Sequence, residues 1–93
     1  MTKPFRWDAD KNKQLMRERG VSFEQITVAV ENGDLRQIVR HPNAMKCPRQ
    51  SIMIVGIDGY AFLVPFVEEA DYYFLKTIIP SRKATRDFIE NKD

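Results

Sequence analysis

The chain has 93 residues and carries 15 Lys plus Arg against 13 Asp plus Glu, with one histidine and one cysteine. A hydrophobic content of 43% at this length predicts one folded domain, residues 1–93, and excludes a disordered chain. The lone Cys47 excludes a disulfide framework and a cysteine-ligated metal site, and the longest apolar run is too short to cross a bilayer.

The N-terminal part of the chain predicts a short edge strand or extended arm followed by a helix. Residues 4–7 are aromatic and extended in character, and Asp8 follows them. An aspartate in this place accepts hydrogen bonds from the free amides of a first helical turn, and glycine supplies a left-handed stop. We therefore expect a helix over residues 9–19 that ends at Gly20 and has a thin apolar face around Leu15.

A second helix is predicted over residues 22–32. Ser22 and Gln25 have the spacing of a capping box, in which each side chain accepts a hydrogen bond from the backbone amide of the other residue. Phe23 and Ile26 lie three residues apart on one side of this helix. That spacing gives it a better core face than the first helix has.

After Gly33 the hydrophobic period changes from helical to roughly two, which is typical of strands. The predicted strands are residues 35–40, 51–57, 60–67 and 72–79. Asp58-Gly59 has the sequence of a two-residue type I′ turn, so the second and third of these strands should form an antiparallel hairpin. Residues 43–49 show no clear period and are predicted to be a loop.

A C-terminal helix completes the predicted fold. Pro80 ends the last strand, Ser81 can cap the helix that follows, and Ala84 and Phe88 give this helix a core face. The predicted order is β-α-α-β-β-β-β-α, an α+β fold with two N-terminal helices and one C-terminal helix. We expect the helices to gather on one face of a mostly antiparallel sheet.

Three stretches of the sequence resemble BrnT-type toxins, which are bacterial toxins of type II toxin–antitoxin pairs with a RelE-like fold. Phe5-Arg6-Trp7-Asp8 with Lys11 resembles the family's opening F-x-W-D-x-x-K, and Gly20-Val21-Ser22-Phe23 follows at the family's spacing. Near the other end, Ile78-Ile79-Pro80-Ser81-Arg82-Lys83-Ala84-Thr85 resembles the family's closing I-I-S-A-R-(R/K)-A-T. The resemblance therefore covers both ends of the chain.

This resemblance implies a growth-inhibiting toxin that cleaves messenger RNA without a metal or a cofactor. It also implies a cognate antitoxin of the ribbon-helix-helix type, and operator DNA would be contacted only through the complex with that antitoxin. Residues 1–13 lack the apolar stretch of a secretory signal, so we expect a cytoplasmic protein without a membrane partner. One histidine and one cysteine also fall short of a metal site.

Three residues are the candidate catalytic groups, because metal-free RNA cleavage needs a route for the 2′-hydroxyl proton and a cation beside the phosphate. Histidine titrates near neutrality, so His41 is a candidate general base, or else a hydrogen-bonded turn residue. Lys76 can reach from the last strand into a cleft or mark an exposed edge. Arg82 matches the family's closing arginine and either contacts phosphate or is simply solvated.

Five further basic residues are predicted to bind RNA phosphates: Arg40, Lys46, Arg49, Lys83 and Arg86. Arg40 adjoins the single histidine, His41. Arg49, together with Lys46, could clamp a phosphate, because the planar guanidinium of arginine binds phosphate in a bidentate manner; otherwise both residues belong to a solvated loop. Lys83 and Arg86 lie in the first turns of the predicted C-terminal helix, where the helix dipole favours an anion.

Other classes of function are also consistent with the sequence. Leu15, Arg19 and Thr77 stand where the toxin family usually has other residues, as in a divergent branch. The chain could thus retain the toxin fold as a non-catalytic module that binds nucleic acid or a partner protein. Such a module would bind RNA with a steep salt dependence and leave it intact. A toxin of this fold directed at a protein such as DNA gyrase is a third possibility.

Overall fold

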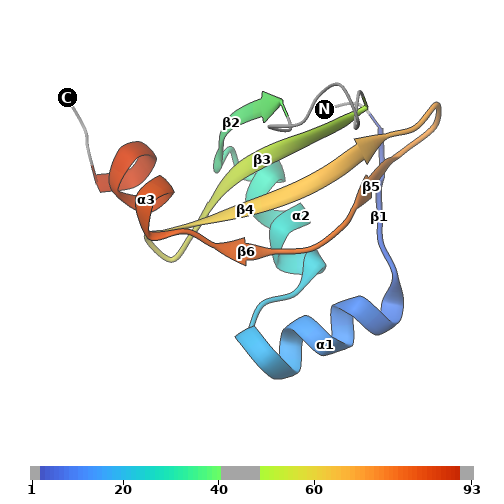
Figure 1. Cartoon of the computed structure of the whole chain (residues 1–93), viewed down its shortest axis with the longest axis horizontal. Coiled ribbons are helices and arrows are strands. Elements are labelled where there is room, and N and C mark those ends of the chain that lie inside the picture. Colours follow the sequence, from blue (N-terminus) through green and yellow to red (C-terminus); the bar gives the residue numbers. More distant parts are fainter. Residues whose placement is uncertain (1–2, 41–48, 91–93) are drawn as a thin grey trace.

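The structure, a computed structural model, describes residues 3–40 and 49–90 of the chain. Its elements in chain order are β1 (Phe5–Arg6), α1 (Ala9–Arg19), α2 (Phe23–Glu31), β2 (Leu35–Arg40), β3 (Gln50–Ile57), β4 (Tyr60–Glu68), β5 (Tyr73–Leu75), β6 (Ile79–Pro80), α3 (Arg82–Thr85) and the π-helical turn η1 (Arg86–Glu90). The fold is α+β, with helices packed on a mostly antiparallel sheet, as predicted (Figure 1). Within the two described ranges, no helix is both long and apolar enough to cross a membrane.

Local side-chain chemistry places the two N-terminal helices where the sequence predicts them. The Asp8 carboxylate accepts two first-turn amides of α1 at 2.8 and 3.0 Å, and Gly20 ends this helix with a φ of 69°. At the start of α2, Ser22 and Gln25 form the predicted capping box. These caps provide partners for amides that the start of a helix otherwise leaves unsatisfied.

The predicted hairpin between β3 and β4 is present. Asp58 and Gly59 both have a positive φ, 52° and 78°, as a type I′ turn requires. The two strands pair in regular antiparallel register along the whole of β3. The sheet order is β1-β5-β4-β3-β2, with β1 parallel to β5, so β1 and β2 form the two edges among the described strands.

The last long strand is not continuous, and the predicted order of elements is wrong in this place. The strand expected over residues 72–79 forms two short pieces, β5 and β6, which both pair with β4. The register shifts by one residue between them, because Phe66 lies opposite Leu75 whereas Leu63 lies opposite Ile79. The described part of the chain therefore has six strands instead of the five that were predicted.

Pro65 of β4 explains the break. Its carbonyl accepts the Lys76 amide at 2.8 Å, but a proline has no N–H to donate in return, so the regular ladder ends there. Within the break, the Arg19 guanidinium at the end of α1 donates to the carbonyl of Ile78. Arg19 and the buried Leu15 are two of the positions that depart from the toxin pattern, and both have structural roles here.

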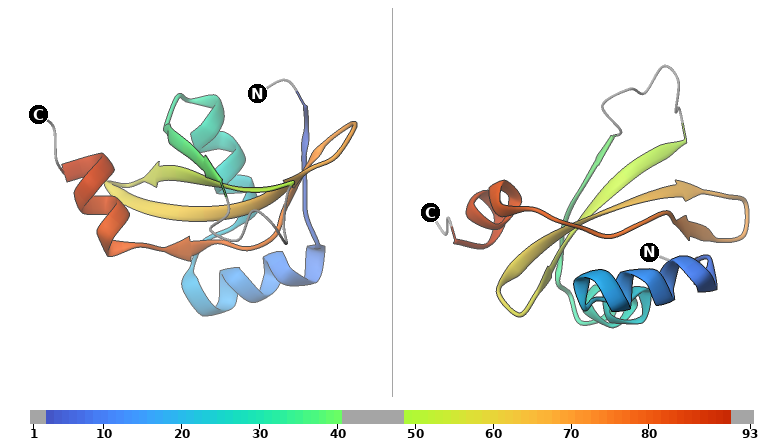
Figure 2. Two further views of the ribbon diagram at one scale, coloured as in Figure 1. Left: turned by 45° about the horizontal axis from the view of Figure 1, so that its top comes forward. Right: turned by 60° about the horizontal axis from the view of Figure 1, so that its bottom comes forward.

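The helices lie on both faces of the sheet, which corrects the prediction of a single helical face. On one face Phe23 of α2 packs in a core cluster with Met53, while on the other Ala84 of α3 packs with Ile54 and Ala61. Met53 and Ile54 serve opposite clusters because side chains alternate along a strand. We call these sides the α2 face and the α3 face; Figure 2 shows α1 and α2 together and the C-terminal segment apart from them.

Asn12 links the two N-terminal helices through a buried amide. Its Oδ1 accepts the backbone amide of Phe23 at 2.8 Å, and its Nδ2 donates to the Glu24 carboxylate at 2.7 Å. The hydrogen bond from Asn12, followed by that from the backbone amide of Glu24 itself, lowers the pKa of the Glu24 carboxyl. Both bonds favour the charged form, which is why the shift is downward.

We expect Asn12→Ala to raise the pKa of Glu24 toward the ordinary glutamate value, about 4.3. Because the folded-state pKa lies below the unfolded one, the stabilisation is present above that ordinary value and is lost as the pH falls through the folded value. Carboxyl NMR titration measures the pKa, and urea unfolding at acidic pH measures the stability. Lys13→Ala, on the exposed side of the same helix, is the control; an unchanged Glu24 titration in Asn12→Ala would contradict this account.

Candidate nucleic-acid interface

The α3 face carries a row of half-buried apolar residues with a lysine at one end. The register places Val39 beside Ile52 and Ile52 beside Pro65, whose carbonyl accepts the Lys76 amide. Leu75 is buried in the core of the α2 face, so the next side chain, Lys76, points to the α3 face. Lys76 is exposed there, which leaves its ammonium accessible from solvent.

Lys76 lies among aromatic side chains of β5 and its flanks. Tyr72, Phe74 and Lys76 alternate with residues of the opposite face and so share the α3 face. The Lys76 Nζ lies 5.8 Å from the centroid of the Phe74 ring. On the neighbouring edge strand, Arg6 is opposite Phe74, and its Cζ lies 5.3 Å from the centroid of the Tyr72 ring. Two cations thus stand beside two aromatic rings at this end of the sheet.

A hollow of about 390 Å³ opens beside these rings. It is lined by Arg6, Trp7, Tyr72 and Phe74, and we call it the Trp7 pocket. Trp7 itself stacks on Phe23, with ring centroids 5.5 Å apart and an interplanar angle of 25°. The Trp7 ring therefore packs on the core and also lines a pocket.

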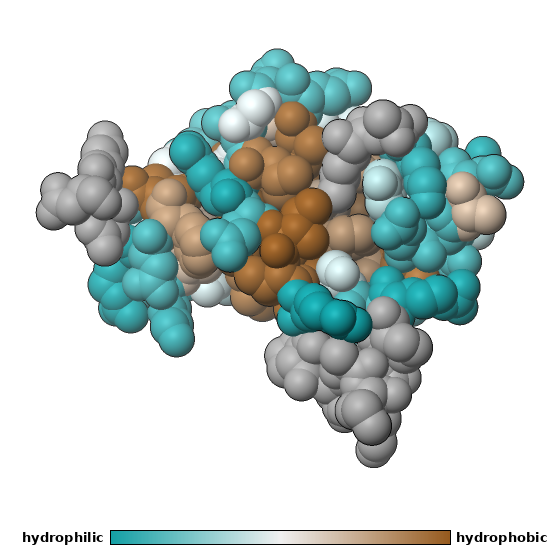
Figure 3. Space-filling model, turned by 90° about the horizontal axis from the view of Figure 1, so that it is seen from above, coloured by the Kyte–Doolittle hydropathy of each residue, from teal (hydrophilic) through white to brown (hydrophobic). Residues whose placement is uncertain are grey.

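A second hollow, of about 270 Å³, lies between the sheet and the C-terminal helical segment. Its lining is mostly apolar and includes Val39, Leu63 and Phe88, with Lys83 and Asp87 as the charged members. Figure 3 shows hydrophobic side chains gathered in the middle of the surface, between the C-terminal segment and the hydrophilic β4–β5 turn. The apolar row of the sheet leads from the Lys76 end toward this hollow, since Val39 belongs to both.

The three predicted basic residues of the C-terminal segment are all exposed. Arg82 and Lys83 begin α3, while the Nε of Arg86 forms a long ion pair of 3.8 Å with the adjacent aspartate. The Ser81 hydroxyl already accepts the Ala84 amide at 3.1 Å, so one amide of this helix start has its partner within the chain. The side chains of Arg82 and Lys83, more than the short helix itself, are the groups that can meet a phosphate.

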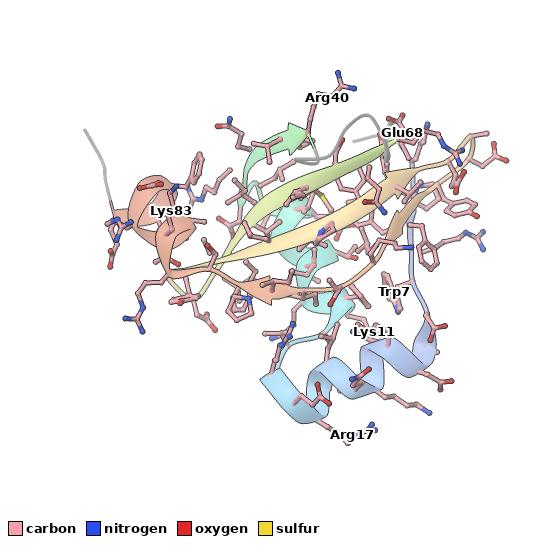
Figure 4. The ribbon with its side chains drawn as sticks, viewed as in Figure 1. Trp7, Lys11, Arg17, Arg40, Glu68 and Lys83 are labelled. Carbon is pink, nitrogen blue, oxygen red and sulfur yellow. The ribbon has the colours of Figure 1, made fainter. Side chains whose placement is uncertain are left out.

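The backbones of Lys76 and of the residue before Arg82 meet β4 at different places. Lys76 bonds to the carbonyl of Pro65, while Ser81, the residue before Arg82, bonds through its amide to the carbonyl of Ala61. Four residues along a strand span about 13 Å at about 3.3 Å per residue. An RNA strand would have to lie along the α3 face to touch both cations. Figure 4 shows Lys83 of α3 at one end of the molecule and Trp7 toward the other.

The remaining predicted residues fall into two groups. Arg40 is the exposed last residue of β2, and Nη1 of the exposed Arg49 donates to Glu69 in an ion pair of 3.2 Å. His41 and Lys46 lie outside the residues that the structure describes. The catalytic role of His41 and the phosphate contact of Lys46 therefore stay predictions.

The opposite side of the molecule is less suited to RNA. A hollow of about 420 Å³ between α2 and the β3–β4 hairpin is lined by Glu24, Asp34 and Asp58 together with apolar residues such as Val28. Three carboxylates repel a phosphate backbone, whereas the cations described above lie on or beside the α3 face. This hollow therefore suits a polyanion less than the α3 face does.

The aromatic residues of β5 and Arg6 were missed as site residues in the sequence. Tyr72, Phe74 and Lys76 recur at every second position, and this alternation already places them on one face of a strand. The contribution of Arg6 has no such signal, because it depends on the parallel pairing of β1 with β5. A period-two search for aromatic and basic residues would have found the first group alone.

A scan against protein-family models gives no match for the chain, and no curated protein is significantly similar to it. The residues that carry the resemblance to BrnT-type toxins nevertheless have clear structural tasks. Asp8 and Ser81 cap helices, Gly20 ends one, and Thr85 donates to the carbonyl of Ser81 while accepting the Ala61 amide at 2.8 Å. These motifs thus specify the fold more directly than they specify a reaction.

Proposed function

We propose that the chain is the toxin of a type II toxin–antitoxin pair and acts on single-stranded messenger RNA along the α3 face. The observation that carries this proposal is Lys76 on that face, beside the Phe74 ring and at the end of an apolar row. Aromatic faces next to cations suit single-stranded RNA, because bases stack on the rings while the phosphates meet the charges. A RelE-like arrangement and a cytoplasmic location belong to the same proposal.

The proposed reaction is metal-independent cleavage, in which the RNA's own 2′-oxygen attacks the adjacent phosphorus while the bond from phosphorus to the 5′-oxygen breaks. A 2′,3′-cyclic phosphate and a 5′-hydroxyl end form; the general base takes the proton of the 2′-hydroxyl, and water supplies the proton of the leaving oxygen. In this reaction, the exposed Lys76 stabilises the charge that develops on the phosphorane. Arg82 holds the strand further along the same face. His41 is the proposed general base, as the sequence predicts.

A neutralising antitoxin is the proposed protein partner. The hollow between the sheet and α3 offers it an apolar floor, including Leu63 and Phe88, next to the exposed Lys83. An antitoxin that fills this hollow would also cover the end of the proposed RNA track. The ribbon-helix-helix type and the contact with operator DNA follow from the resemblance alone.

One observation favours a second function, a non-catalytic module that binds RNA. The amides of Lys76 and Ser81 meet β4 at residues about 13 Å apart along the strand, and cleavage requires groups that reach one phosphate directly or through a water. If His41 does not complete the site at one of these two cations, the α3 face binds RNA without cutting it. Growth and RNA integrity separate the two functions.

Inducible expression in a bacterial host tests the proposal. We expect the wild-type chain to arrest growth and to create discrete new RNA ends that primer extension detects, whereas Arg82→Ala gives weaker arrest and fewer ends. Arg17→Ala, on the side of α1 that points away from the sheet in Figure 4, should behave like the wild type. Soluble protein that leaves growth unimpaired and RNA intact would overturn the toxin proposal, and RNA binding by that protein would support the second function.

A further inference from the structure

We infer that the Trp7 pocket binds one nucleotide, with its base against the aromatic walls and its phosphate on Arg6. This inference rests on the proposed function when the nucleotide is part of an RNA strand. The pocket is about 390 Å³ in volume, and three of its four lining side chains are aromatic. Its fourth side chain, Arg6, is the charged member of the lining.

The aromatic walls match a nucleobase because both partners are flat and have apolar faces that stack. Trp7 is held in place from behind by its stacked contact with Phe23. Phe74 lies in β5 and Tyr72 directly precedes this strand, and both side chains line the same pocket without any rearrangement of the backbone. The pocket is thus formed before a ligand arrives, which lowers the cost of binding.

The charges around the pocket match a phosphate. Arg6 is exposed and can bind phosphate oxygens with two parallel hydrogen bonds. The Lys76 ammonium, 5.8 Å from the centroid of the Phe74 ring, adds a second cation at the side facing the apolar row. The carboxylate that follows Trp7 in sequence, Asp8, already accepts the first amides of α1. A base must leave its stack to enter such a pocket, so the chemistry selects single-stranded over duplex RNA.

The single tryptophan of the chain makes the pocket directly measurable, because all tryptophan fluorescence comes from Trp7. We would titrate the full chain with a short single-stranded 2′-O-methyl RNA, which cannot be cleaved through its 2′-hydroxyl. The expected result is saturable quenching of Trp7. Phe74→Leu, which keeps an apolar side chain, should weaken the binding roughly 5- to 150-fold through the loss of one base stack. Tyr60→Leu, in the β3–β4 hairpin, should leave it unchanged.

A parallel titration with adenosine and uridine monophosphates separates the two sources of a nucleotide. Quenching by RNA that is weakened in Phe74→Leu supports a base site within the RNA track. Quenching by monophosphates alone supports the pocket as a site for free nucleotides and counts against RNA as its ligand. RNA binding seen by anisotropy, with unchanged Trp7 fluorescence and full affinity in Phe74→Leu, overturns the pocket while the proposed function stands. If neither ligand binds, both proposals fail.

Discussion

Replacing Phe23 by alanine is expected to destabilise the fold by about 3–5 kcal/mol, since large-to-small changes of a buried aromatic residue have this cost. Phe23 is fully buried in the core of the α2 face and also supports Trp7 from behind. Domains of this size are stable by only about 5–15 kcal/mol, so a large share of the stability would be lost. Urea unfolding followed by tryptophan fluorescence measures the effect.

Val28→Ala is the matched control for this prediction. Val28 lies on the same helix, but its side chain is 53% exposed, so its truncation should cost within about 0.5 kcal/mol. In the Phe23 variant, the emission of Trp7 should also shift toward that of a solvated indole, because its stacking partner is gone. Equal unfolding midpoints for the two variants would contradict the packing described here.

The second large effect concerns Lys76 and RNA. We expect Lys76→Gln to lower the affinity for single-stranded RNA about tenfold, which corresponds to the loss of one charge-assisted hydrogen bond. The slope of log affinity against log salt should fall by about 0.7, because one fewer counterion-releasing contact is made. Anisotropy titrations of a labelled RNA at several salt concentrations measure both quantities.

Two further variants make this prediction specific to the position of Lys76. Lys76→Arg keeps the charge beside the Phe74 ring and should retain most of the affinity. Lys13→Gln removes one exposed charge from α1 and should leave the affinity nearly unchanged. If both glutamine variants lost affinity equally, the binding would follow net charge alone and the α3 face would have no special role.

The elements whose ends depend on local chemistry could be predicted from the sequence. Asp8, Gly20 and Ser22 mark the helix ends through caps that involve only near neighbours, and Asp58-Gly59 marks its turn through its own backbone conformation. Such signals do not depend on the rest of the fold. The predicted residue ranges of both N-terminal helices and of the β3–β4 hairpin agree with the structure for this reason.

Features that depend on which residues meet across the sheet could not be predicted in the same way. The break between β5 and β6 follows from the place of Pro65 opposite Lys76, and a register between distant strands is not visible in either segment alone. The face on which α3 packs is also not visible in the sequence, because α3 follows the break and packs on Ile54 and Ala61 of distant strands. The sequence pattern for a core face at Ala84 is right, but it does not say against which face of the sheet this residue packs.

The candidate site also has one part that the local sequence predicts and another part that depends on pairing between distant strands. The alternation of residues on β5 predicts that Lys76 faces away from Leu75, and the burial of Leu75 agrees with this. The approach of Arg6 to the Tyr72 ring needs the parallel pairing of an N-terminal strand with a late one. Neighbourhood in sequence therefore finds Lys76 and the basic residues of the C-terminal helix, but it does not bring Arg6 to the aromatic end of the sheet.

Crosslinking of a 4-thiouridine-labelled single-stranded RNA to the full chain, followed by mass spectrometry of the crosslinked peptides, locates the RNA directly. If RNA lies along the α3 face, the crosslinks fall on β5 and the segment that leads to β6, with Phe74 and its neighbours as the main positions, and Lys76→Gln reduces their yield. Crosslinks confined to α1 and α2 would contradict this placement, and so would a yield unaffected by Lys76→Gln.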